Sequence, residues 1–397
     1  MILHSISRRL FLGLGLGTVA ALSGCGPDER SVRIGDDDGT ARDAGTEETW
    51  VSGTPRATPP RSVYESWPVL CRADDGAAVL AYSCGDLHGR SASRLVVFTR
   101  STDGGVSWTE ETVLEEPGYD LSIYSLSTLS DGNLFAIVRR VRAADNSDWT
   151  HLVYVSSDAG RTWNRRGAPI RVPNTPVLLE PVCETVSGTL LTCWHAEPGE
   201  GGGSLAWGLL RSEDRGETWS QEEFGTAPSI DDLPVEGRLL RLPDDRLLMM
   251  WREQTEGRAV RMALGDAEGR GWDPLVRTNI TDAWATPLAP VVDGDRIHLY
   301  WFDRGSMTFR VRRAPLSVDD DLTSWPESEV YGEVRAPSPW DSGYVDACLL
   351  EAGVHLTAFY AGDRSGTRVY THTWTAMRPG AATDGGTGGD FVLPSES

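Results

Sequence analysis

The fold of this chain is decided by the stretch Ser101-Thr102-Asp103-Gly104-Gly105-Val106-Ser107-Trp108 and by two further copies of its pattern, at residues 156–163 and 212–219. All three copies read Ser-x-Asp-x-Gly-x-Ser/Thr-Trp. Weaker copies follow at residues 266–272 and 319–325, so that successive tryptophans are 55, 56, 53 and 53 residues apart. A period of this length indicates an array of similar structural units.

The residue types of this pattern favour a structural role at a turn. An aspartate can accept hydrogen bonds from turn amides, and a glycine adopts backbone angles that other residues resist. A tryptophan packs a large apolar area. We therefore interpret each copy as a clasp between neighbouring units rather than as an acidic catalytic site.

Each unit also carries a predicted hairpin, in which two apolar runs flank a pair of turn residues. Six such hairpins occur, with turns at residues 75–76, 131–132, 187–188, 244–245, 293–294 and 352–353. This number predicts six blades of about four strands each. The fold class is therefore expected to be all-β, a six-bladed β-propeller that occupies residues 61–377 as one domain.

The first 25 residues have the features of an export signal. Arg8 and Arg9 precede an apolar run that is too short to span a bilayer permanently, which resembles a twin-arginine translocation signal. The run ends in Leu22-Ser23-Gly24-Cys25, which resembles a lipobox. We expect Cys25 to be lipidated in an exported protein, anchored in the cell envelope or released. The alternatives are a plain secretory signal with a chance cysteine and an N-terminal membrane helix.

Two flanking segments have too few large apolar side chains to order themselves. Residues 26–60 are rich in Asp, Glu, Gly, Thr and Pro and are expected to form an acidic, disordered tether. Residues 378–397 are rich in Gly and Thr and are expected to form a disordered tail.

The charge of the chain argues against nucleic acid as a partner. The formal net charge is −21, and removal of Arg8 and Arg9 with the signal leaves −23. None of the 37 basic residues is a lysine. This absence excludes a Schiff-base lysine and a P-loop lysine.

The cysteines and histidines give no pattern typical of a metal site. Five cysteines remain if Cys25 is lipidated, so at least one stays unpaired. The pairs Cys71/Cys84 and Cys183/Cys193 are spaced to staple hairpins, and buried free thiols are the alternative. Because no His/Cys spacing resembles a zinc site, we expect no catalytic metal and no cofactor. A structural calcium ion is compatible with so acidic a chain.

Repeats of this type and spacing resemble the Asp-box (BNR) repeats of the sialidase (neuraminidase) superfamily, over about residues 61–377. The resemblance implies a bacterial exo-α-sialidase-like lipoprotein whose boxes lie on the outer rim, away from catalysis. In this family a tyrosine polarised by a glutamate is the nucleophile, because the substrate carboxylate would repel a carboxylate nucleophile. Three arginines bind that carboxylate, and an aspartate serves as acid and base.

The expected site residues follow from aligning the six hairpins on their turns. Nine residues before the common turn position stand Trp67, Ile123, Leu179, Glu236, Ala285 and Tyr344. Seven residues after it stand Ser83, Arg139, His195, Arg252, Trp301 and Tyr360. These strand ends are expected to converge on one mouth of the central channel.

Four residues match the catalytic pattern of the family. The stretch from Glu236 to Arg252 resembles the segment that begins with the activating glutamate and ends with a triad arginine. Arg304 stands where another triad arginine is expected, and Tyr344 where the nucleophile is expected. We expect Glu236 to accept the Tyr344 proton while both arginines stabilise the phenolate and hold the substrate acid. A structural Glu236–Arg252 ion pair beside a channel-lining tyrosine is the alternative.

The sequence departs from the family at the first triad arginine. The first blade reads Val63-Tyr64-Glu65-Ser66-Trp67-Pro68 where a Phe/Tyr-Arg-Ile-Pro signature is expected. Arg139, at the equivalent strand end of the second blade, is the candidate replacement.

Two further candidates depend on single residues near the expected channel mouth. Asp86, on the loop after the second strand of the first blade, is the candidate acid, and His88 is the alternative. His195, with Glu180 near it, is a candidate substrate contact, and a merely hydrogen-bonded histidine is the alternative.

The expected function is that of an exo-acting glycoside hydrolase with a tyrosine nucleophile and a retaining mechanism. Its partner is a glycan or glycoconjugate that ends in sialic acid or a related acidic sugar. It contacts a membrane only through its N-terminal lipid. The alternatives are an exo-glycosidase for a different sugar, such as a uronic acid, and a non-catalytic propeller that binds glycans or a protein.

Overall fold

The computed structural model describes residues 31–32, 49–52, 56–57, 61–89, 91, 93–172, 176–196, 205–315, 321–333, 338–363, 365–377 and 391–392. Regular structure in these residues is β, apart from two short 3-10 turns, η1 (Ile230–Asp232) and η2 (Pro339–Asp341). None of the described helices is long and apolar enough to cross a membrane. The expected signal with Cys25, most of the tether and most of the tail lie outside the described residues.

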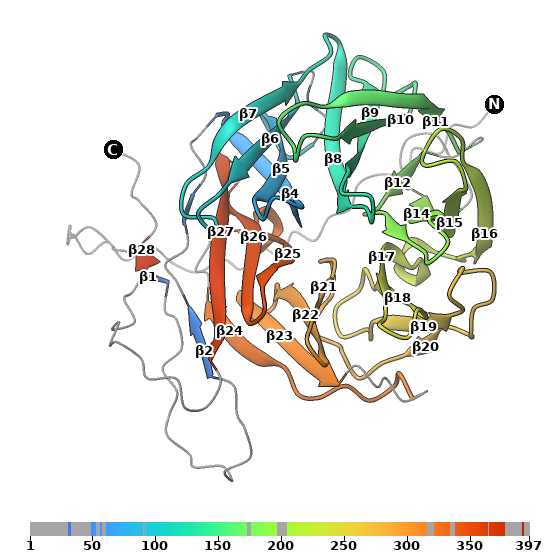
Figure 1. The fold of residues 1–397 in the computed structure, drawn as a ribbon, viewed down its shortest axis with the longest axis vertical. Helices are drawn as coiled ribbons and strands as arrows, with labels where there is room; N and C mark the ends of the chain where they lie inside the picture. The colour runs from blue at the N-terminus through green and yellow to red at the C-terminus, as the bar shows by residue number, and fades with distance from the viewer. Residues whose placement is uncertain are drawn as a thin grey trace, which may run out of the picture.

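Four separate antiparallel sheets of four or five strands form blades (Figure 1). The first comprises β8 (Tyr119–Thr128), β9 (Leu134–Arg142), β10 (Thr150–Ser156) and β11 (Asn164–Ile170). The second comprises β12 (Val177–Leu179), β13 (Cys183–Glu184), β14 (Leu190–Ala196), β15 (Ala206–Ser212) and β16 (Ser220–Thr226). The third comprises β17 (Val235–Arg241), β18 (Leu247–Arg252), β19 (Arg261–Gly265) and β20 (Val276–Arg277). The fourth comprises β21 (Ala289–Asp293), β22 (Arg296–Asp303), β23 (Thr308–Pro315) and β24 (Glu329–Glu333).

A nine-stranded sheet closes the ring. Its first half is β4 (Tyr64–Arg72), β5 (Ala78–Gly85), β6 (Leu95–Ser101) and β7 (Thr109–Leu114). Its second half is β25 (Gly343–Glu351), β26 (Val354–Asp363) and β27 (Gly366–Met377), with β2 (Thr49–Ser52) and β3 (Arg56–Ala57) paired to β27. A short pair, β1 (Ser31–Val32) with β28 (Phe391–Val392), is separate.

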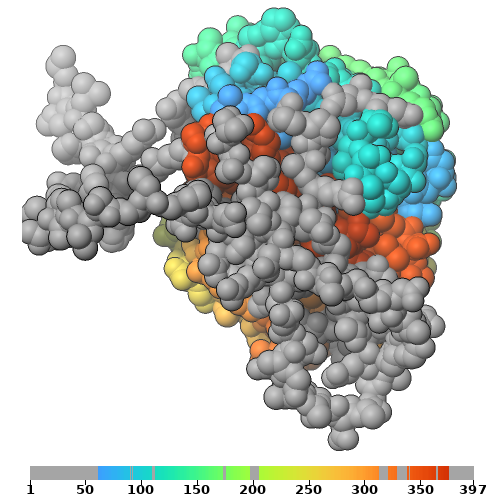
Figure 2. All heavy atoms as spheres, turned by 90° about the vertical axis from the view of Figure 1, so that its left-hand side faces the viewer, coloured from blue at the N-terminus to red at the C-terminus, as the bar shows by residue number. Residues whose placement is uncertain are grey.

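The two halves of the nine-stranded sheet meet through a parallel pair, in which Thr367 of β27 lies opposite Tyr64 of β4. Figure 2 shows this edge of the molecule, with early and late segments of the chain side by side. The expectation of an all-β propeller is confirmed. The described residues form four separate blades and not six, because the strands expected for the first and sixth blades are hydrogen-bonded into one sheet.

The three complete Asp boxes have the same internal hydrogen bonds. In the first, Asp103 Oδ1 accepts hydrogen bonds from the Ser107 amide and from Ser101 Oγ, both at 2.8 Å. Ser101 Oγ in turn accepts a hydrogen bond from the Gly105 amide at 2.8 Å. The same contacts recur around Asp158 and Asp214. The interpretation of the box as a structural clasp at a turn is confirmed.

The last glycine of each complete box lies against the set of strands before it around the ring. A Cβ atom at Gly216, beside β16, would lie 2.7 Å from the ring of Phe135 in β9. A Cβ atom at Gly160 would lie 3.1 Å from Val79 in β5, and its φ of +85° already favours glycine. The box therefore needs a residue without a side chain at this position for two reasons, the backbone angle and the close approach of the neighbouring sheet.

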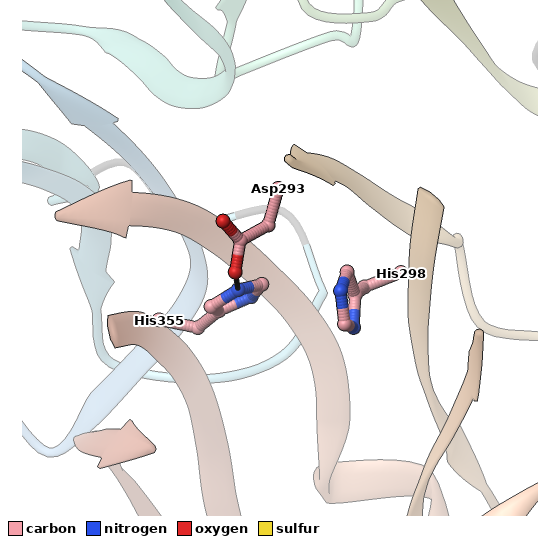
Figure 3. Close-up of side chains that lie close together, drawn as sticks. All are labelled: Asp293, His298 and His355. Carbon is pink, nitrogen blue, oxygen red and sulfur yellow. Dashed lines mark hydrogen bonds and ion pairs between the residues drawn. The ribbon is translucent and has the colours of Figure 1, made fainter. Parts of the chain in front are cut away.

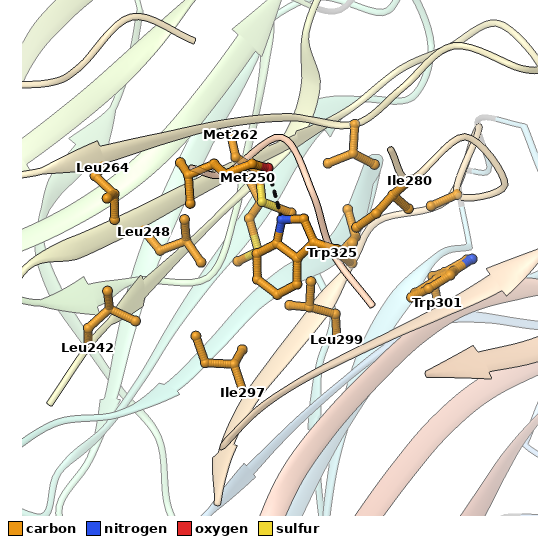
Figure 4. Packing of buried hydrophobic residues seen from close by; sticks show 14 residues of the cluster. Leu242, Leu248, Met250, Met262, Leu264, Ile280, Ile297, Leu299, Trp301 and Trp325 are labelled. Carbon is orange, nitrogen blue, oxygen red and sulfur yellow. Dashed lines mark hydrogen bonds between the residues drawn. The ribbon is translucent and has the colours of Figure 1, made fainter. Parts of the chain in front are cut away.

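The box tryptophans pack in the same direction around the ring. Trp163 stacks on Phe98 of β6, with ring centroids 4.2 Å apart. Trp325, in the last of the weaker copies, packs among Leu248 and Met250 of β18 (Figure 4). Trp163 and Trp325 thus join their own sheets to the one before, and Trp108 joins the first half of the nine-stranded sheet to its second half through Thr371.

The innermost strands confirm the alignment of the hairpins. Residues ten before and seven after the turn position are paired in five of the hairpins: Ser66 with Ser83, Ser122 with Arg139, Leu178 with His195, Val235 with Arg252 and Gly343 with Tyr360. The strand contains one extra residue directly after this pair in β4, β17 and β25, and one position later in β8. Such a bulge bends the strand and redirects its side chains.

Backbone strain accompanies these bulges. Trp67, Glu236 and Tyr344 have φ angles of +51°, +48° and +49°, and Ala285, at the equivalent position before β21, has +53°. Non-glycine residues occupy this region at a cost of about 1–3 kcal/mol each, and such residues cluster at functional sites. The repeated strain marks one end of the innermost strands as the place to search for a site.

The five described cysteines, at positions 71, 84, 183, 193 and 348, are buried free thiols. Burial raises the pKa of Cys71 and of Cys183 to about 12, so neither is reactive at neutral pH. The two expected hairpin disulfides are not formed, and the alternative of buried thiols is confirmed.

Replacing a box glycine should cost more than replacing a glycine that has only an unusual backbone angle. We expect Gly216→Ala to lower the free energy of unfolding by about 2–4 kcal/mol, from a positive φ and from overpacking against Phe135. Gly118, with φ +82° and open space within 4 Å of where a Cβ atom would lie, is the matched control and should lose about 1–2 kcal/mol. Urea unfolding of both variants measures the difference. Equal losses of stability would contradict the close contact between Gly216 and Phe135.

Candidate active site

A cavity of about 580 Å³ opens at the strained end of the innermost strands. Its lining includes six residues from the two aligned positions: Trp67, Glu236, Tyr344, Arg139, His195 and Arg252. The prediction that these strand ends converge on one mouth is confirmed for these six.

Tyr344, Glu236 and Arg252 form a hydrogen-bonded chain in the wall of the cavity. The Tyr344 hydroxyl donates to Glu236 Oε1 at 2.5 Å, and Arg252 Nε donates to Glu236 Oε2 at 2.5 Å. The Glu236 and Arg252 side chains are only 6% and 7% exposed. Both carboxylate oxygens are therefore engaged, one by a phenol and one by a guanidinium.

The charges of these three hydrogen-bonded residues determine whether the proton lies on Tyr344 or on Glu236. Burial alone would raise the pKa of the Glu236 carboxyl, but Arg252 and the Tyr344 hydroxyl lower it to about 2. Burial, and then the charge of Glu236, raise the pKa of Tyr344 well above its usual value near 10. The free site therefore holds a neutral phenol beside an ionised carboxylate.

His195 supports Glu236 from the neighbouring sheet. Its Nδ1 accepts a hydrogen bond from the Glu236 backbone amide at 3.2 Å, so the Nδ1 atom carries no proton. Burial lowers the pKa of His195 to about 4. This neutral imidazole lines the cavity and also satisfies a backbone amide at the strained Glu236 position.

Two arginines share one buried carboxylate on the opposite wall. Arg139 Nη2 donates to Asp120 Oδ1 at 2.9 Å, and Arg94 Nη1 donates to Asp120 Oδ2 at 2.7 Å. Burial would raise the pKa of Asp120, but Arg139 and Arg94 lower it below its usual value. The guanidinium of Arg94 also lies 4.9 Å from the centroid of Trp67, and that of Arg139 lies 5.2 Å from the centroid of Trp149. This wall carries a net positive charge framed by aromatic rings.

A third group of polar residues lies at the rim. The Tyr64 hydroxyl donates to Asp341 Oδ1 at 2.7 Å and lies 2.6 Å from His88 Nδ1. Because the hydroxyl has a single proton, His88 Nδ1–H must donate to the Tyr64 oxygen. In the neutral ring Nε2 is then unprotonated. Burial lowers the pKa of His88, and Asp341 opposes this effect.

Two predicted site residues lie outside the cavity lining. Arg304 is buried and donates to the backbone oxygens of Ala285 at 2.8 Å and Ser342 at 3.0 Å. It thus braces the loops before β21 and before Tyr344. Asp86 is exposed and is not among the lining residues, whereas His88, two positions on, is.

Known protein families include one whose model matches this chain. Residues 126–330 match the family model of the BNR repeat-like domain. The chain belongs to this family. The resemblance of its Asp boxes to those of the sialidase/BNR superfamily is confirmed. No curated protein matches the chain.

Solved structures with the same fold include enzymes for different sugars. A Dyadobacter fermentans protein of unknown function has 16% identity and a TM-score of 0.63, over 82% of this chain and 99% of that one. The Hadza microbial sialidase Hz136 has 18% identity and a TM-score of 0.59, over 81% and 67%. The α-L-arabinanase of Penicillium chrysogenum has 16% identity and a TM-score of 0.58, over 81% and 98%. At these identities the likeness shows a shared fold.

Two residues that line the cavity, Arg94 and Asp120, were not predicted from the sequence. Arg94 directly precedes β6, and Asp120 is near the start of β8, so neither falls on the two aligned positions. An alignment that also included the residues at the starts of β6 and β8 would have pointed to both. The partners of His88 could not, because Tyr64 and Asp341 meet only through ring closure.

The buried His195 should make folding sensitive to pH. Its pKa is about 4 when folded and near 6.5 when unfolded, so the unfolded chain binds the proton first and stability falls as pH drops below 6.5. We expect the stability advantage of the wild type over His195→Gln to shrink by about 2 kcal/mol between pH 6.5 and 5. Urea unfolding across this range measures it, and a constant difference would contradict a neutral, buried His195.

Proposed function

We propose that this BNR-family chain is an exo-acting glycoside hydrolase of sialidase type, which removes a terminal sialic acid or related acidic sugar with Tyr344 as nucleophile. The observation that carries the proposal is the Tyr344–Glu236–Arg252 chain in the cavity wall. A structural ion pair needs no third partner, whereas a phenol that shares a proton with a buried carboxylate suits a nucleophile with its base.

In the first step the Tyr344 oxygen attacks the anomeric carbon as the bond to the leaving oxygen breaks. The phenol proton passes to Glu236 Oε1, which already accepts its hydrogen bond at 2.5 Å. The pKa values of the free site oppose prior ionisation, so the proton moves as the new C–O bond forms and no phenolate accumulates. Arg252 then stabilises the carboxyl and the phenolic oxygen. In the second step water attacks the anomeric carbon, the bond to the Tyr344 oxygen breaks, and that oxygen recovers its proton from Glu236, with retention of configuration overall.

The leaving oxygen needs a proton donor, and His88 is better placed for this role than Asp86. His88 lines the cavity, and its Nδ1–H is held through Tyr64 to the buried Asp341 carboxylate. A proton on Nε2 is then favoured by the charge of Asp341 and can be delivered to the substrate. The same nitrogen can accept a proton from water in the second step. Asp86 remains the alternative donor if its loop closes over the substrate.

The arginines of the cavity support recognition of an acidic sugar. Arg252, Arg139 and Arg94 line the cavity together with the carboxylates Glu236 and Asp120, with which they pair, and with Asp145. A substrate carboxylate can accept hydrogen bonds from guanidinium donors that point into the cavity. Arg304 would act by positioning Tyr344 through the Ser342 carbonyl.

A second candidate function is favoured by the pairing of Arg139 and Arg94 with Asp120. Because the Asp120 carboxylate already accepts a hydrogen bond from each guanidinium group, this wall suits a sugar other than sialic acid, whose hydroxyls bridge the charged pairs. The aromatic rings of Trp67 and Trp149 suit the apolar face of such a sugar. An exo-glycosidase for a uronic acid or a neutral sugar is therefore the alternative enzyme.

Two expectations about the whole chain remain proposals. We propose that residues 1–25 direct export, with lipid on Cys25. The part of residues 26–60 that precedes β2 would be the tether to the cell envelope, because β2 and β3 are paired to β27. We also propose that the nine-stranded sheet is built from the first and sixth of six blades, because β4–β7 and β25–β27 are antiparallel sets joined by a parallel pair.

Removal of the Tyr344 hydroxyl should abolish turnover. We expect Tyr344→Phe to lower kcat/KM on a fluorogenic sialoside by at least about 1,000-fold, because the nucleophile is lost while the ring is kept. Tyr370→Phe, in a buried tyrosine outside the cavity lining, is the control for loss of a tyrosine hydroxyl.

Equal, measurable rates for wild type and Tyr344→Phe would overturn the nucleophile. A wild type that is inactive on sialosides but cleaves a uronic acid or arabinan oligosaccharide would favour the alternative enzyme. Binding on a glycan array that survives Tyr344→Phe and Glu236→Gln, without turnover of any substrate, would identify a binding protein.

The pH profile should distinguish His88 from Asp86 as the proton donor. Because the pKa of His88 lies below 6.5, its protonated fraction, and with it kcat/KM, should increase as pH falls from 8 to 6. We expect His88→Gln to remove this increase and Asp86→Asn to keep it. The opposite pattern would assign the role to Asp86.

A further inference from the structure

Asp293, His298 and His355 form a cluster at the end of the innermost strands that is opposite to the cavity. Asp293 ends β21, His298 lies on β22 and His355 lies on β26. One nitrogen or oxygen from each of the three side chains lies within 4.8 Å of the other two. Figure 3 shows the hydrogen bond between Asp293 and His355, with the His298 ring beside them.

Hydrogen bonds from neighbouring groups hold the side chains of the cluster in place, as they do around the ligands of a metal site. His355 Nε2 lies 2.9 Å from Asp293 Oδ2, which also accepts a hydrogen bond from the Gly353 amide at 3.0 Å. His355 Nδ1 lies 2.9 Å from the Tyr300 hydroxyl. The two imidazole rings meet edge to face, with centroids 4.6 Å apart. A ligand histidine whose second nitrogen is held by an oxygen is typical of zinc sites.

Packing holds both histidine rings in place. His298 and His355 are 1% and 0% exposed, so the rings are fixed by packing before any ion arrives. The Asp293 side chain is 13% exposed, which leaves the cluster within reach of solvent. Two imidazoles and a carboxylate are ligands that suit zinc, whereas calcium and magnesium prefer oxygen alone.

We propose that Asp293, His298 and His355 bind a zinc ion that clips the sheet of β21–β24 to the second half of the nine-stranded sheet. This site is separate from the proposed glycosidase function and does not depend on it. The second Asp293 oxygen or a water molecule completes the fourth position.

Only small movements are needed to form the site. Ligand atoms around tetrahedral zinc, at bond lengths of about 2.0–2.1 Å, lie about 3.4 Å apart. Asp293 Oδ2 and His355 Nε2 are already closer than this, and the His298 nitrogen must approach from within 4.8 Å. When His355 Nε2 binds the ion, the ring proton resides on Nδ1 and is donated to the Tyr300 oxygen. The imidazole stays neutral, and no proton is lost from it.

The ion would stabilise the ring without entering the catalytic cavity. From His355 to Tyr360, five residues at about 3.4 Å each place the cluster roughly 17 Å from the cavity end of β26. We therefore expect zinc to affect unfolding and to leave catalysis unchanged.

The test uses the full chain without a histidine tag, stripped of metal and titrated with zinc alone and with cobalt alone. We expect one zinc per chain after dialysis, measured by mass spectrometry of the metal, and an increase in Tm of several degrees. Cobalt should give a d–d spectrum of a nitrogen- and oxygen-ligated ion without a thiolate charge-transfer band, because the cysteines do not take part.

Variants locate the ion. We expect His298→Gln and Asp293→Asn each to weaken zinc binding by at least about 10-fold to 100-fold. His372→Gln, in a buried histidine outside the cluster, is the control and should bind zinc as the wild type does. Asp293→Asn changes a residue at the surface end of the cluster, so it tests the site even if His298→Gln fails to fold. A stripped protein that takes up no zinc and shows no shift in Tm would overturn the proposal, as would unchanged binding in Asp293→Asn.

Discussion

The ring depends on a contact in which a glycine of one set of strands meets a large side chain of the set before it around the ring. Gly105, Gly160 and Gly216 meet Leu356, Val79 and Phe135 in this way. The aspartate of each box holds the turn that presents the glycine, and the tryptophan covers the same seam with apolar area. Each box therefore joins one set of strands to the set before it around the axis.

The site uses a different device, on the inner edge of the same sheets. An extra residue in the innermost strand, with positive φ at Trp67, Glu236 and Tyr344, redirects these side chains into one cavity. The glutamate and the tyrosine come from different sheets, so the distance between their oxygens is set by how the ring is assembled. The clasps on the outside thus fix the geometry of the proton transfer proposed inside.

Most of the propeller could be predicted from sequence patterns that recur at regular spacing. The boxes, the hairpin turns and the alignment that selected Glu236, Arg252, Tyr344 and Arg139 all follow from spacing along the chain. The features created when β27 pairs with β4 and closes the ring could not be predicted from this spacing. The pairing of Thr367 with Tyr64 merges the first and last sets of strands, and the rim group around His88 exists only because this closure brings Asp341 to Tyr64.

The remaining differences come from contacts between neighbouring elements. Arg304 was expected to touch substrate, yet it braces backbone carbonyls, which a lone arginine in a sequence cannot indicate. Asp86 and His88 are two residues apart, and only the path of their loop separates an exposed side chain from one that lines the cavity. The histidines at positions 298 and 355 belong to different sheets, so no spacing rule relates them.

Tyr344 lies late in the sequence, so it is synthesised after the residues with which it forms hydrogen bonds in the cavity. A ribosome makes the box sheets, Glu236 and Arg252 before the strand that carries the phenol, and β27, which pairs with β4, comes later still. A nascent or prematurely terminated chain can therefore display the proposed base and its arginine without the proposed nucleophile. The cavity becomes complete only when the last strands return to the first, so the proposed catalysis would depend on completion of the fold.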